Sequence, residues 1–403
     1  MKKFFVFLVF FLVFISTFVF ASSQTEAKGV PGVTDTEILI GFTMPMSGPI
    51  GFIGSGTADA VNACFQKYND MGGIYGRKLK LITYDSGMDA AQALANYRKL
   101  VLEDKVFAVL FGFSFFIRPA YPFLAEQGVP WLFPMAPPND AMFPAQKYLF
   151  SLFPTTATQL KTTVKWLINQ DKYHRVAAIY GDSASGKTGL EGLKKDLSGT
   201  NIKIVAAEAI KGDAASAAVQ VAKIRKENPD IVLLFGYTMQ PAATCIKEIK
   251  KVGWDVQIMV NMPITNEVLL RLLTEEEADG LLGAYWGAIQ YTEDRPEDST
   301  PEMRAAAETI LKYYPKSTNL GGLVEHYLSV ELFIEALKRA GKDLTREKLI
   351  DAMESFKDYP TGKGSYATFS PTRREGISGG IITQVKDNWW VQISDWINVD
   401  LDE

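Results

Sequence analysis

Residues 77–112 read RKLKLITYDSGMDAAQALANYRKLVLEDKVFAVLFG and carry the alternation that decides the fold. Apolar residues alternate or cluster over residues 77–86 and again over residues 106–112, which favours two β-strands. The intervening residues 90–104 have the apolar spacing of a helix. A strand, a helix and a further strand in succession form the unit from which parallel sheets with helices on both faces are built.

The same alternation continues on both sides of this stretch. In the first half of the chain, further strands are predicted at residues 37–45 and 129–134. In the second half, strands are predicted at residues 175–182, 202–210, 230–237, 256–261 and 280–292. Two such series predict an α/β protein with two similar doubly wound lobes and parallel central sheets. The C-terminal part adds an amphipathic helix at residues 321–341 and an antiparallel hairpin at residues 380–396.

The N-terminus has the pattern of a secretory signal peptide, residues 1–21. Lys2 and Lys3 precede a 17-residue apolar run, Phe4–Phe20, and Ala21 follows it. A spanning helix needs about 20 such residues, so a signal cleaved after about Ala21 is favoured over an uncleaved membrane anchor. The mature chain is then expected in the periplasm. No cysteine follows the run, so no lipid anchor is expected there.

The net charge and the two cysteines narrow the functional class of the protein further. The net charge of −4 at pH 7 becomes −6 once Lys2 and Lys3 are removed. A mildly acidic chain without a basic block is not typical of nucleic-acid-binding proteins. Cys64 and Cys245 lie in two helical patterns far apart in the sequence, which favours two separately buried thiols. A disulfide stays possible, because an oxidising compartment permits one.

Residues 179–189, IYGDSASGKTG, satisfy the P-loop pattern, in which backbone amides and a lysine bind nucleotide phosphates. The stretch also follows a predicted strand and begins a predicted helix. Two observations argue against a nucleotide. The protein is expected outside the cell, where ATP is scarce. Moreover, no aspartate ends a smooth apolar strand, because Asp85 and Asp395 follow runs that polar residues interrupt.

Several stretches resemble the type I periplasmic binding proteins that serve branched-chain amino-acid ABC transporters, the Leu/Ile/Val-binding family. The resemblance covers residues 33–395 and is carried by residues 38–56, 68–112, 126–134, 230–237 and 335–353. Residues 69–81, NDMGGIYGRKLKL, are its most specific signature. The resemblance implies two lobes joined by three hinge strands, a small-molecule ligand clamped between them, and a membrane permease as partner.

The resemblance also implies where the lobes divide. Lobe 1 is expected at residues 33–154 and 287–360, and lobe 2 at residues 155–286 and 361–403. The P-loop-like stretch then corresponds to a lobe 2 loop that faces the cleft. We therefore interpret it as part of a small-molecule site and not as a nucleotide site.

In the amino-acid binders of this family, hydroxyl groups after two strands of lobe 1 hold the ligand carboxylate. Ser114 falls at the first of these positions and keeps the hydroxyl. The alternative role for Ser114 is to cap the helix that follows. At the second position the chain has Ala136 and Pro137, which offer no hydroxyl. The resemblance therefore implies that one carboxylate contact is missing.

In lobe 2 of the family, an acidic residue and aromatic side chains hold the ligand ammonium. Met262 or Pro263 lies where the acid is expected, and Ser185 stands where a tyrosine is usual. Tyr237 and Thr238 retain the aromatic and hydroxyl positions. A site without this acid has lost the reason to prefer an α-amino group.

Apolar side chains on the neighbouring loops favour a ligand that is more apolar than an amino acid. The candidates at the site are Phe52, Phe115, Met135 and Trp286. We therefore expect an apolar or aromatic small molecule, in particular a carboxylate, in place of free leucine. A branched-chain or other amino acid, or a role as a ligand-sensing receptor subunit, remains the alternative.

Catalytic chemistry has little support in this sequence. His174 and His326 are the only histidines, and neither lies in a nucleophile or metal-binding motif. We expect a binding protein that is not an enzyme, carries no cofactor or metal, and acts as a monomer. Its mechanism would be that of a hinged clamp that closes on the ligand.

Overall fold

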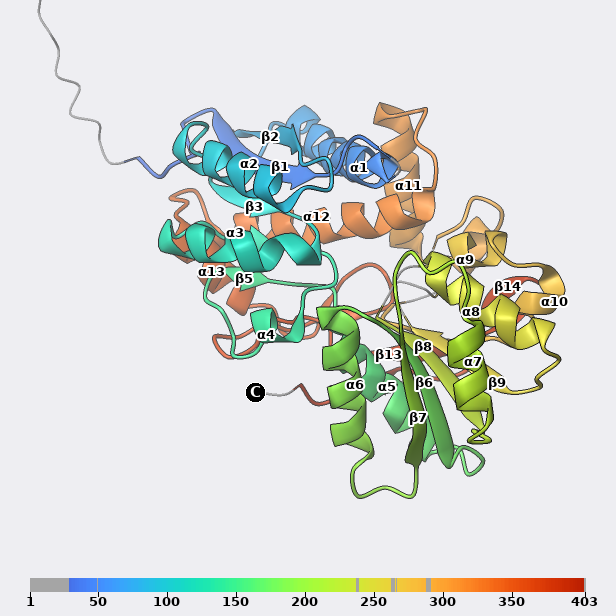
Figure 1. Ribbon diagram of the computed structural model, residues 1–403. Coiled ribbons are helices and arrows are strands. Elements are labelled where there is room, and N and C mark those ends of the chain that lie inside the picture. The colour runs from blue at the N-terminus through green and yellow to red at the C-terminus, as the bar shows by residue number, and fades with distance from the viewer. Residues whose placement is uncertain are drawn as a thin grey trace, which may run out of the picture.

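The computed structural model describes residues 29–48, 50–236, 239–261, 265, 267–287 and 291–401. These residues form two α/β lobes, one above the other in Figure 1. The predicted signal peptide at residues 1–21 lies outside the described residues. Within them, no helix combines the length and the apolar character that crossing a membrane requires.

The first lobe is built on a five-stranded parallel sheet. Its strands are β1 (Glu37–Met44), β2 (Lys78–Asp85), β3 (Ala108–Leu110), β4 (Trp131–Leu132) and β5 (Leu149–Phe150). Their order is β2-β1-β3-β4-β5, and each neighbouring pair is parallel. Residues 77–112 thus form β2, α2 and β3 as predicted, with β1 inserted between the two strands.

Helices cover both faces of this sheet. They are α1 (Gly51–Asp70), α2 (Ala90–Leu102), α3 (Ser114–Glu126), α4 (Asn139–Met142), α11 (Pro301–Tyr313), α12 (Leu320–Ala340) and α13 (Arg346–Glu354). On one face, α1 and α12 pack with Phe42 and Phe65 in the largest buried apolar cluster. On the other face, Tyr97 of α2 and Trp131 of β4 have ring centroids 4.8 Å apart.

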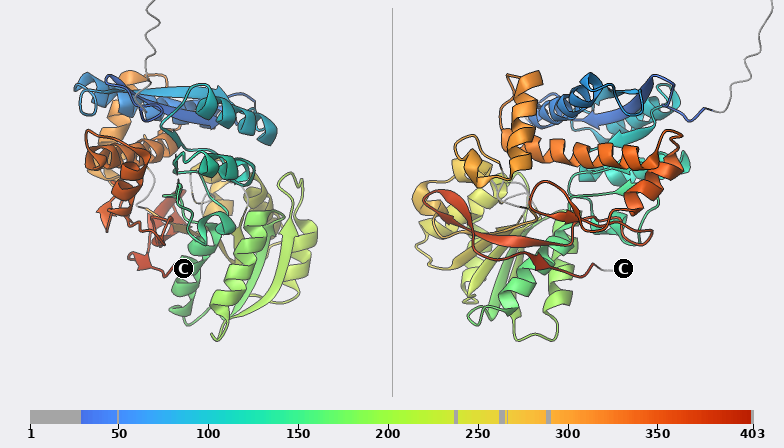
Figure 2. Two further views of the ribbon diagram at one scale, coloured as in Figure 1. Left: turned by 90° about the vertical axis from the view of Figure 1, so that its left-hand side faces the viewer. Right: turned by 180° about the vertical axis from the view of Figure 1, so that it is seen from behind.

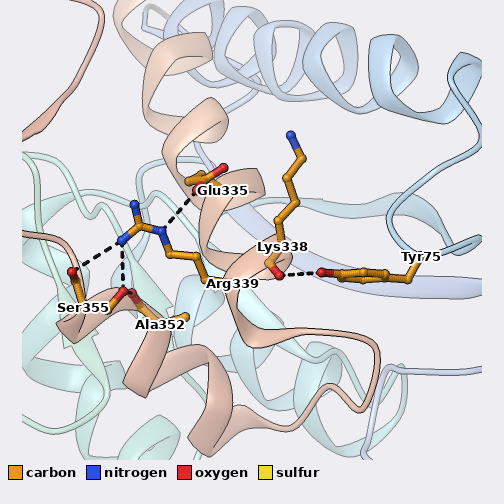
Figure 3. Close-up of polar contacts among 6 residues, drawn as sticks. All are labelled: Tyr75, Glu335, Lys338, Arg339, Ala352 and Ser355. Atoms are coloured by element: carbon orange, nitrogen blue, oxygen red, sulfur yellow. Dashed lines mark hydrogen bonds and ion pairs between the residues drawn. The ribbon is translucent and has the colours of Figure 1, made fainter.

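The long helix α12 is held in place at its C-terminal end, as Figure 3 shows. The Tyr75 hydroxyl, in the turn after α1, donates to the Lys338 carbonyl at 2.6 Å. The Arg339 guanidinium donates to the Glu335 carboxylate at 3.1 Å and to the Ser355 hydroxyl at 3.0 Å. These contacts fix α12 against both α1 and α13. In the N-terminal half of α12, the His326 ring lies 6.1 Å from the ring of Phe153.

The second lobe is built on a larger, mixed sheet. Its strands are β6 (Arg175–Gly181), β7 (Lys203–Ile210), β8 (Ile231–Phe235), β9 (Gln257–Asn261), β10 (Leu282–Tyr285), β13 (Gly379–Lys386), β14 (Trp389–Gln392) and β15 (Ile397–Asn398). Strands β6 to β10 are parallel and repeat the order of the first sheet, β7-β6-β8-β9-β10. The prediction of two similar doubly wound lobes is confirmed.

The predicted C-terminal hairpin is also confirmed. Strands β13 and β14 are antiparallel, and the turn between them has Asp387 at φ 51° and Asn388 at φ 58°. Left-handed conformations at both turn positions match the twist of a two-residue hairpin, and Asp and Asn tolerate them well. Because β13 pairs with β10 in the antiparallel sense, the second sheet is not purely parallel.

Helices α5 (Thr156–Ile168), α6 (Ala184–Leu197), α7 (Ala218–Arg225), α8 (Met239–Lys251), α9 (Glu267–Arg271) and α10 (Glu275–Ala278) belong to this lobe. Figure 2 shows this lobe from two further sides, with the C-terminal strands of its sheet in red. Cys64 and Cys245 are buried in different lobes and form no disulfide with each other. The prediction of two separate buried thiols is confirmed.

The chain passes between the two sheets three times, as predicted. The crossings are residues 151–155 from β5 to α5, a segment between β10 and α11 of which residues 286–287 and 291–300 are described, and residues 368–378 before β13. The second crossing includes the short 3₁₀ helix η1 (Pro296–Asp298), and the third follows the two-stranded sheet of β11 (Tyr359–Pro360) and β12 (Tyr366–Ala367).

The first and third crossings lie side by side. The Ser151 amide donates to the Arg374 carbonyl at 2.9 Å, and the Gly376 amide donates to the Ser151 carbonyl at 2.8 Å. Ala367 and Phe369 are buried in the same apolar cluster as the first sheet. The exact residues at which the lobes divide stay a prediction.

The third crossing buries a carboxyl group at the hinge. Glu375 is fully buried and faces the first turn of α5, where Thr155 caps the helix. Burial raises the pKa of Glu375 to about 7, although the nearby Thr158 and Thr155 and the charge of Arg373 act in the opposite direction. A carboxyl group with such a pKa is protonated more readily in the folded chain than in the unfolded chain.

Replacing Glu375 by glutamine should therefore change how stability depends on pH. In the wild type, folding favours the protonated carboxyl, so its contribution is fully present below pH 4.5 and is lost as the pH rises through 7. Glutamine cannot titrate, so E375Q should gain on the order of 3 kcal/mol relative to wild type between pH 4.5 and 8. Urea unfolding at both pH values measures this gain. The exposed E308Q should show no such change, and an E375Q curve parallel to wild type would contradict the assignment.

Candidate functional site

The topology of the two sheets indicates where a ligand binds. In each sheet the strand order reverses once, between β1 and β3 in the first lobe and between β6 and β8 in the second. Ligands of open parallel sheets bind beyond the carboxyl ends of the strands at such a reversal. The loops there follow β1, β3, β6 and β8, and they contain or adjoin most of the residues predicted from the sequence.

In the first lobe, the loops after β3 and β4 lie side by side. Phe113 and Met135 form an isolated parallel bridge, and the Met135 amide donates to the Gly112 carbonyl at 2.8 Å. This contact brings Ser114 close to the Met135–Pro137 segment, as the resemblance implied. Ser114 is the first residue of α3, and the position before the helix is Phe113. The alternative role of Ser114 as the helix cap is therefore wrong.

Three residues of these loops hold a left-handed backbone that only glycine adopts readily. They are Phe111 at φ 57°, Phe133 at φ 63° and Ala136 at φ 45°. Such conformations cost on the order of 1–3 kcal/mol each and concentrate at functional sites. Here they turn Phe111 and Phe133 toward each other, with ring centroids 6.4 Å apart. The strained segments thus mark the same region as the predicted residues.

Aromatic side chains lie at the start of α3 and at the start of α1. Phe113 and Phe115 are stacked with ring centroids 5.5 Å apart, and Phe115 makes an edge-on contact with Phe116 at 4.3 Å. Phe115 is 42% exposed, and Phe52 on α1 is 60% exposed. Met135 is half-buried beside Phe113. The first lobe therefore presents apolar surface next to the Ser114 hydroxyl.

The second lobe contributes fewer described residues. Tyr237, Thr238 and Met262 lie outside the described residues, and their predicted roles stay predictions. Ser185, on α6, shares a hydrogen bond of 2.6 Å with the hydroxyl of Thr156 at the start of α5. This hydroxyl therefore already has a partner within the lobe.

Trp286 lies at the second crossing, directly after β10, and is 3% exposed. Its ring stacks on Tyr285 at 5.8 Å and meets Phe153 of the first crossing edge-on at 5.8 Å. Within the described chain, its indole nitrogen has no hydrogen-bond partner. The structure thus places Trp286 at the hinge, in contact with the first crossing.

The hinge also holds polar residues that the sequence did not identify. Glu325 and His326 of α12 and Lys363 of the β11–β12 turn are all at most 5% exposed. His326 Nδ1 lies 3.0 Å from the Thr57 hydroxyl. Burial, followed by the charge of Lys363, lowers the pKa of His326 to about 3, so this imidazole is neutral at physiological pH. In the sequence, only the position of Glu325 and His326 inside the apolar run GGLVEHYLSV indicated that these two polar side chains are buried.

The P-loop-like stretch has structural partners for its key residues. Lys187 forms an ion pair with Asp182 at 2.8 Å, and the hydrogen bond from Lys187 lowers the pKa of Asp182. Ser183 caps α6 by accepting from the Gly186 amide at 3.1 Å. A side chain on Gly186 would collide with the Gly181 carbonyl oxygen. These contacts account for the lysine and the glycine without a phosphate.

A family model described as periplasmic binding protein matches residues 37–388. The chain belongs to the periplasmic binding protein family. This result confirms the type I resemblance inferred from the sequence. The match spans most of both sheets and all of the loops described above.

Curated relatives are distant in sequence. The Leu/Ile/Val-binding protein of Escherichia coli (strain K12) is 24% identical over 246 residues, which are 61% of this chain and 66% of the relative. The leucine-, isoleucine-, valine-, threonine-, and alanine-binding protein of Pseudomonas aeruginosa is 21% identical over 358 residues, 87% of this chain and 92% of the relative. The chain thus spans about two thirds of the first relative and most of the second.

Solved structures share the fold of this periplasmic binding protein. A fatty acid ABC transporter substrate-binding protein from Thermomonospora curvata has a TM-score of 0.79 and 22% identity, covering 93% of this chain and 95% of its own. A branched chain amino acid ABC transporter protein from Thermus thermophilus with bound valine has a TM-score of 0.77 and 17% identity, covering 91% and 98%. At such identities the likeness shows the fold alone.

The close approach at Gly186 gives a test of this interpretation of the loop. G186A should lower the free energy of unfolding by about 1–3 kcal/mol, because its methyl group meets the Gly181 backbone. G212A is the matched control, since a side chain there would have no neighbour within 4 Å. Urea unfolding of both variants measures the difference. Equal stability of G186A and G212A would show that the glycine is not required for packing.

Proposed function

We propose that this protein is the extracytoplasmic binding component of an ABC importer, and that its ligand is an apolar or aromatic carboxylate. The observation that carries the proposal is the pairing of one hydroxyl, Ser114, with an aromatic surface at the start of α3. The relatives named above bind branched-chain amino acids, and one structural neighbour is a fatty-acid binder. The proposed ligand combines an acid group with apolar bulk.

The chemistry of the site favours a ligand without an ammonium group. In the resemblance the ammonium is held by an acid, and Met262 or Pro263 occupies that position here. An ammonium buried without a negative partner costs several kcal/mol. A carboxylate needs only hydrogen-bond donors, and both the Ser114 hydroxyl and the unpartnered buried donors at the hinge can supply them. Phe115 and Met135 then contact the apolar part.

The proposed mechanism is closure about the three crossings. A ligand that contacts both lobes shifts the equilibrium from an open to a closed form, whereas one that binds both forms equally shifts nothing. The paired first and third crossings form the hinge, and the permease recognises the closed form. The mature, periplasmic chain acts as a monomer without catalysing a reaction.

A branched-chain amino acid is the second candidate. The relatives favour it, and the buried carboxyl group of Glu325 at the hinge offers a negative partner that the sequence comparison did not supply. Because a zwitterion and a simple carboxylate differ by one ammonium group, direct binding measurements separate the two candidates.

Isothermal titration calorimetry with five compounds tests the proposal. Benzoate and decanoate represent aromatic and aliphatic carboxylates, and leucine, isoleucine and valine represent the family's amino acids. We expect at least one carboxylate to bind at least about tenfold more tightly than every amino acid, a difference of about 1.4 kcal/mol. Tight, exothermic binding of leucine with no binding of either carboxylate would overturn the proposed ligand class.

A further inference from the structure

Lys363 is a lysine that the fold buries almost completely. It lies in the turn between β11 and β12 and is 1% exposed. Its ammonium nitrogen has no hydrogen-bond partner among the residues that the structure describes. The nearest aromatic neighbour is Phe153 of the first crossing, whose ring centroid is 5.4 Å from the ammonium. Lysines are almost never buried in this way without a partner.

A second unsatisfied donor lies beside it. The Trp286 indole N–H is also buried and has no acceptor in the described part of the chain. Trp286 and Lys363 both contact Phe153. In addition, a side chain on Gly287 would lie only 2.9 Å from the Lys363 carbonyl oxygen, so the two segments touch. Two buried donors therefore meet at the junction of the first and second crossings.

One acid lies near Lys363, but the Lys363 ammonium forms no hydrogen bond with it among the described residues. Glu325 is the acid whose charge acts on Lys363, and it is itself 4% exposed with Oε1 unpaired among the described residues. Burial lowers the pKa of Lys363 and raises the pKa of Glu325. The neighbouring His326 is neutral. An unpaired buried ammonium is costly, and an anion that fills its hydrogen-bonding sites removes that cost.

We propose that the Lys363 ammonium and the Trp286 indole N–H bind the carboxylate of the ligand at the hinge. This inference rests on the proposed function, because it requires a carboxylate ligand. A carboxylate has two acceptor oxygens, and both groups in question are donors without acceptor capacity. The rings of Phe153 and Trp286 leave apolar surface for the carbon atoms next to the acid group.

The position of the subsite explains how binding is coupled to closure. Lys363 lies in the segment between α13 and the third crossing, on the side of the first lobe, whereas Trp286 directly follows β10 of the second lobe. A carboxylate bound to both groups ties the two lobes together at the hinge. Charge-assisted hydrogen bonds are about twice as strong as neutral ones. Closure brings the two donors together around the carboxylate, so the ligand binds the closed form more tightly than the open form.

Substitution of Lys363 tests the proposal with the full mature chain. K363M keeps a long apolar stem and removes the charge, and K357M is the matched control on an exposed lysine nearby. Calorimetry with benzoate and decanoate should show a loss of affinity of about 10- to 100-fold in K363M and none in K357M. Benzamide lacks the negative charge, so the K363M substitution should not change its affinity. It should bind K363M and wild type equally well, or bind neither protein.

A second variant covers the case in which K363M does not fold. W286F preserves the aromatic packing on Phe153 and removes only the indole N–H, so carboxylate affinity should fall by roughly 3- to 10-fold. Thermal unfolding of each variant establishes that it is folded. Because Met replaces an unpaired buried ammonium, the melting temperature of K363M should equal or exceed that of wild type.

The outcomes separate this inference from the proposed function. If wild type binds neither carboxylate, the proposed function fails, and the inference fails with it. If wild type binds a carboxylate and both K363M and W286F bind it equally well, the inference alone is overturned. Leucine binding that depends on both Lys363 and Glu325 would instead assign the pair to an amino acid and overturn the carboxylate assignment.

Discussion

The pairing of the first and third crossings is the constraint on which the rest of the structure depends. Two backbone hydrogen bonds of Ser151, with Arg374 and Gly376, fix how the lobes meet. Arg374 is itself buried, forms an ion pair with Glu354 at 2.7 Å and lies over the Phe150 ring at 4.3 Å. The first and third crossings are thereby held together where the two sheets meet.

Buried charge concentrates around this hinge in a way that stability alone does not explain. Glu375, Glu325 and Lys363 are each removed from water, and burial shifts the pKa of each toward its neutral form. Buried ionisable groups weaken a fold unless they are paired. Strained backbone at Phe111 and Phe133 lies close to the same place, where Phe111 contacts His326 with ring centroids 5.1 Å apart. This combination is typical of a functional region.

Much of the fold follows from local sequence patterns, because strands and helices are set by periods of two and 3.6 residues. The hairpin at Asp387 and the burial of Cys64 were predicted in this way. The prediction that Ser114 could cap α3 was wrong, although serine is a common residue at the position before a helix. In the structure the helix already begins at Ser114, where burial of Phe116 and Ile117 stabilises the first turn.

The candidate site was predictable only where it lies on loops after strands, as with Ser114 and Met135. Lys363 was not, since a lysine in the sequence TGKGS reads as an exposed turn. Its burial is set by Phe153 and Gly287, which are distant in sequence.

Lobe closure on the ligand is tested most directly by small-angle X-ray scattering of the mature protein with and without saturating benzoate or decanoate. The account predicts a smaller radius of gyration with the bound carboxylate. Superimposable scattering curves, with binding verified in the same sample, would contradict it.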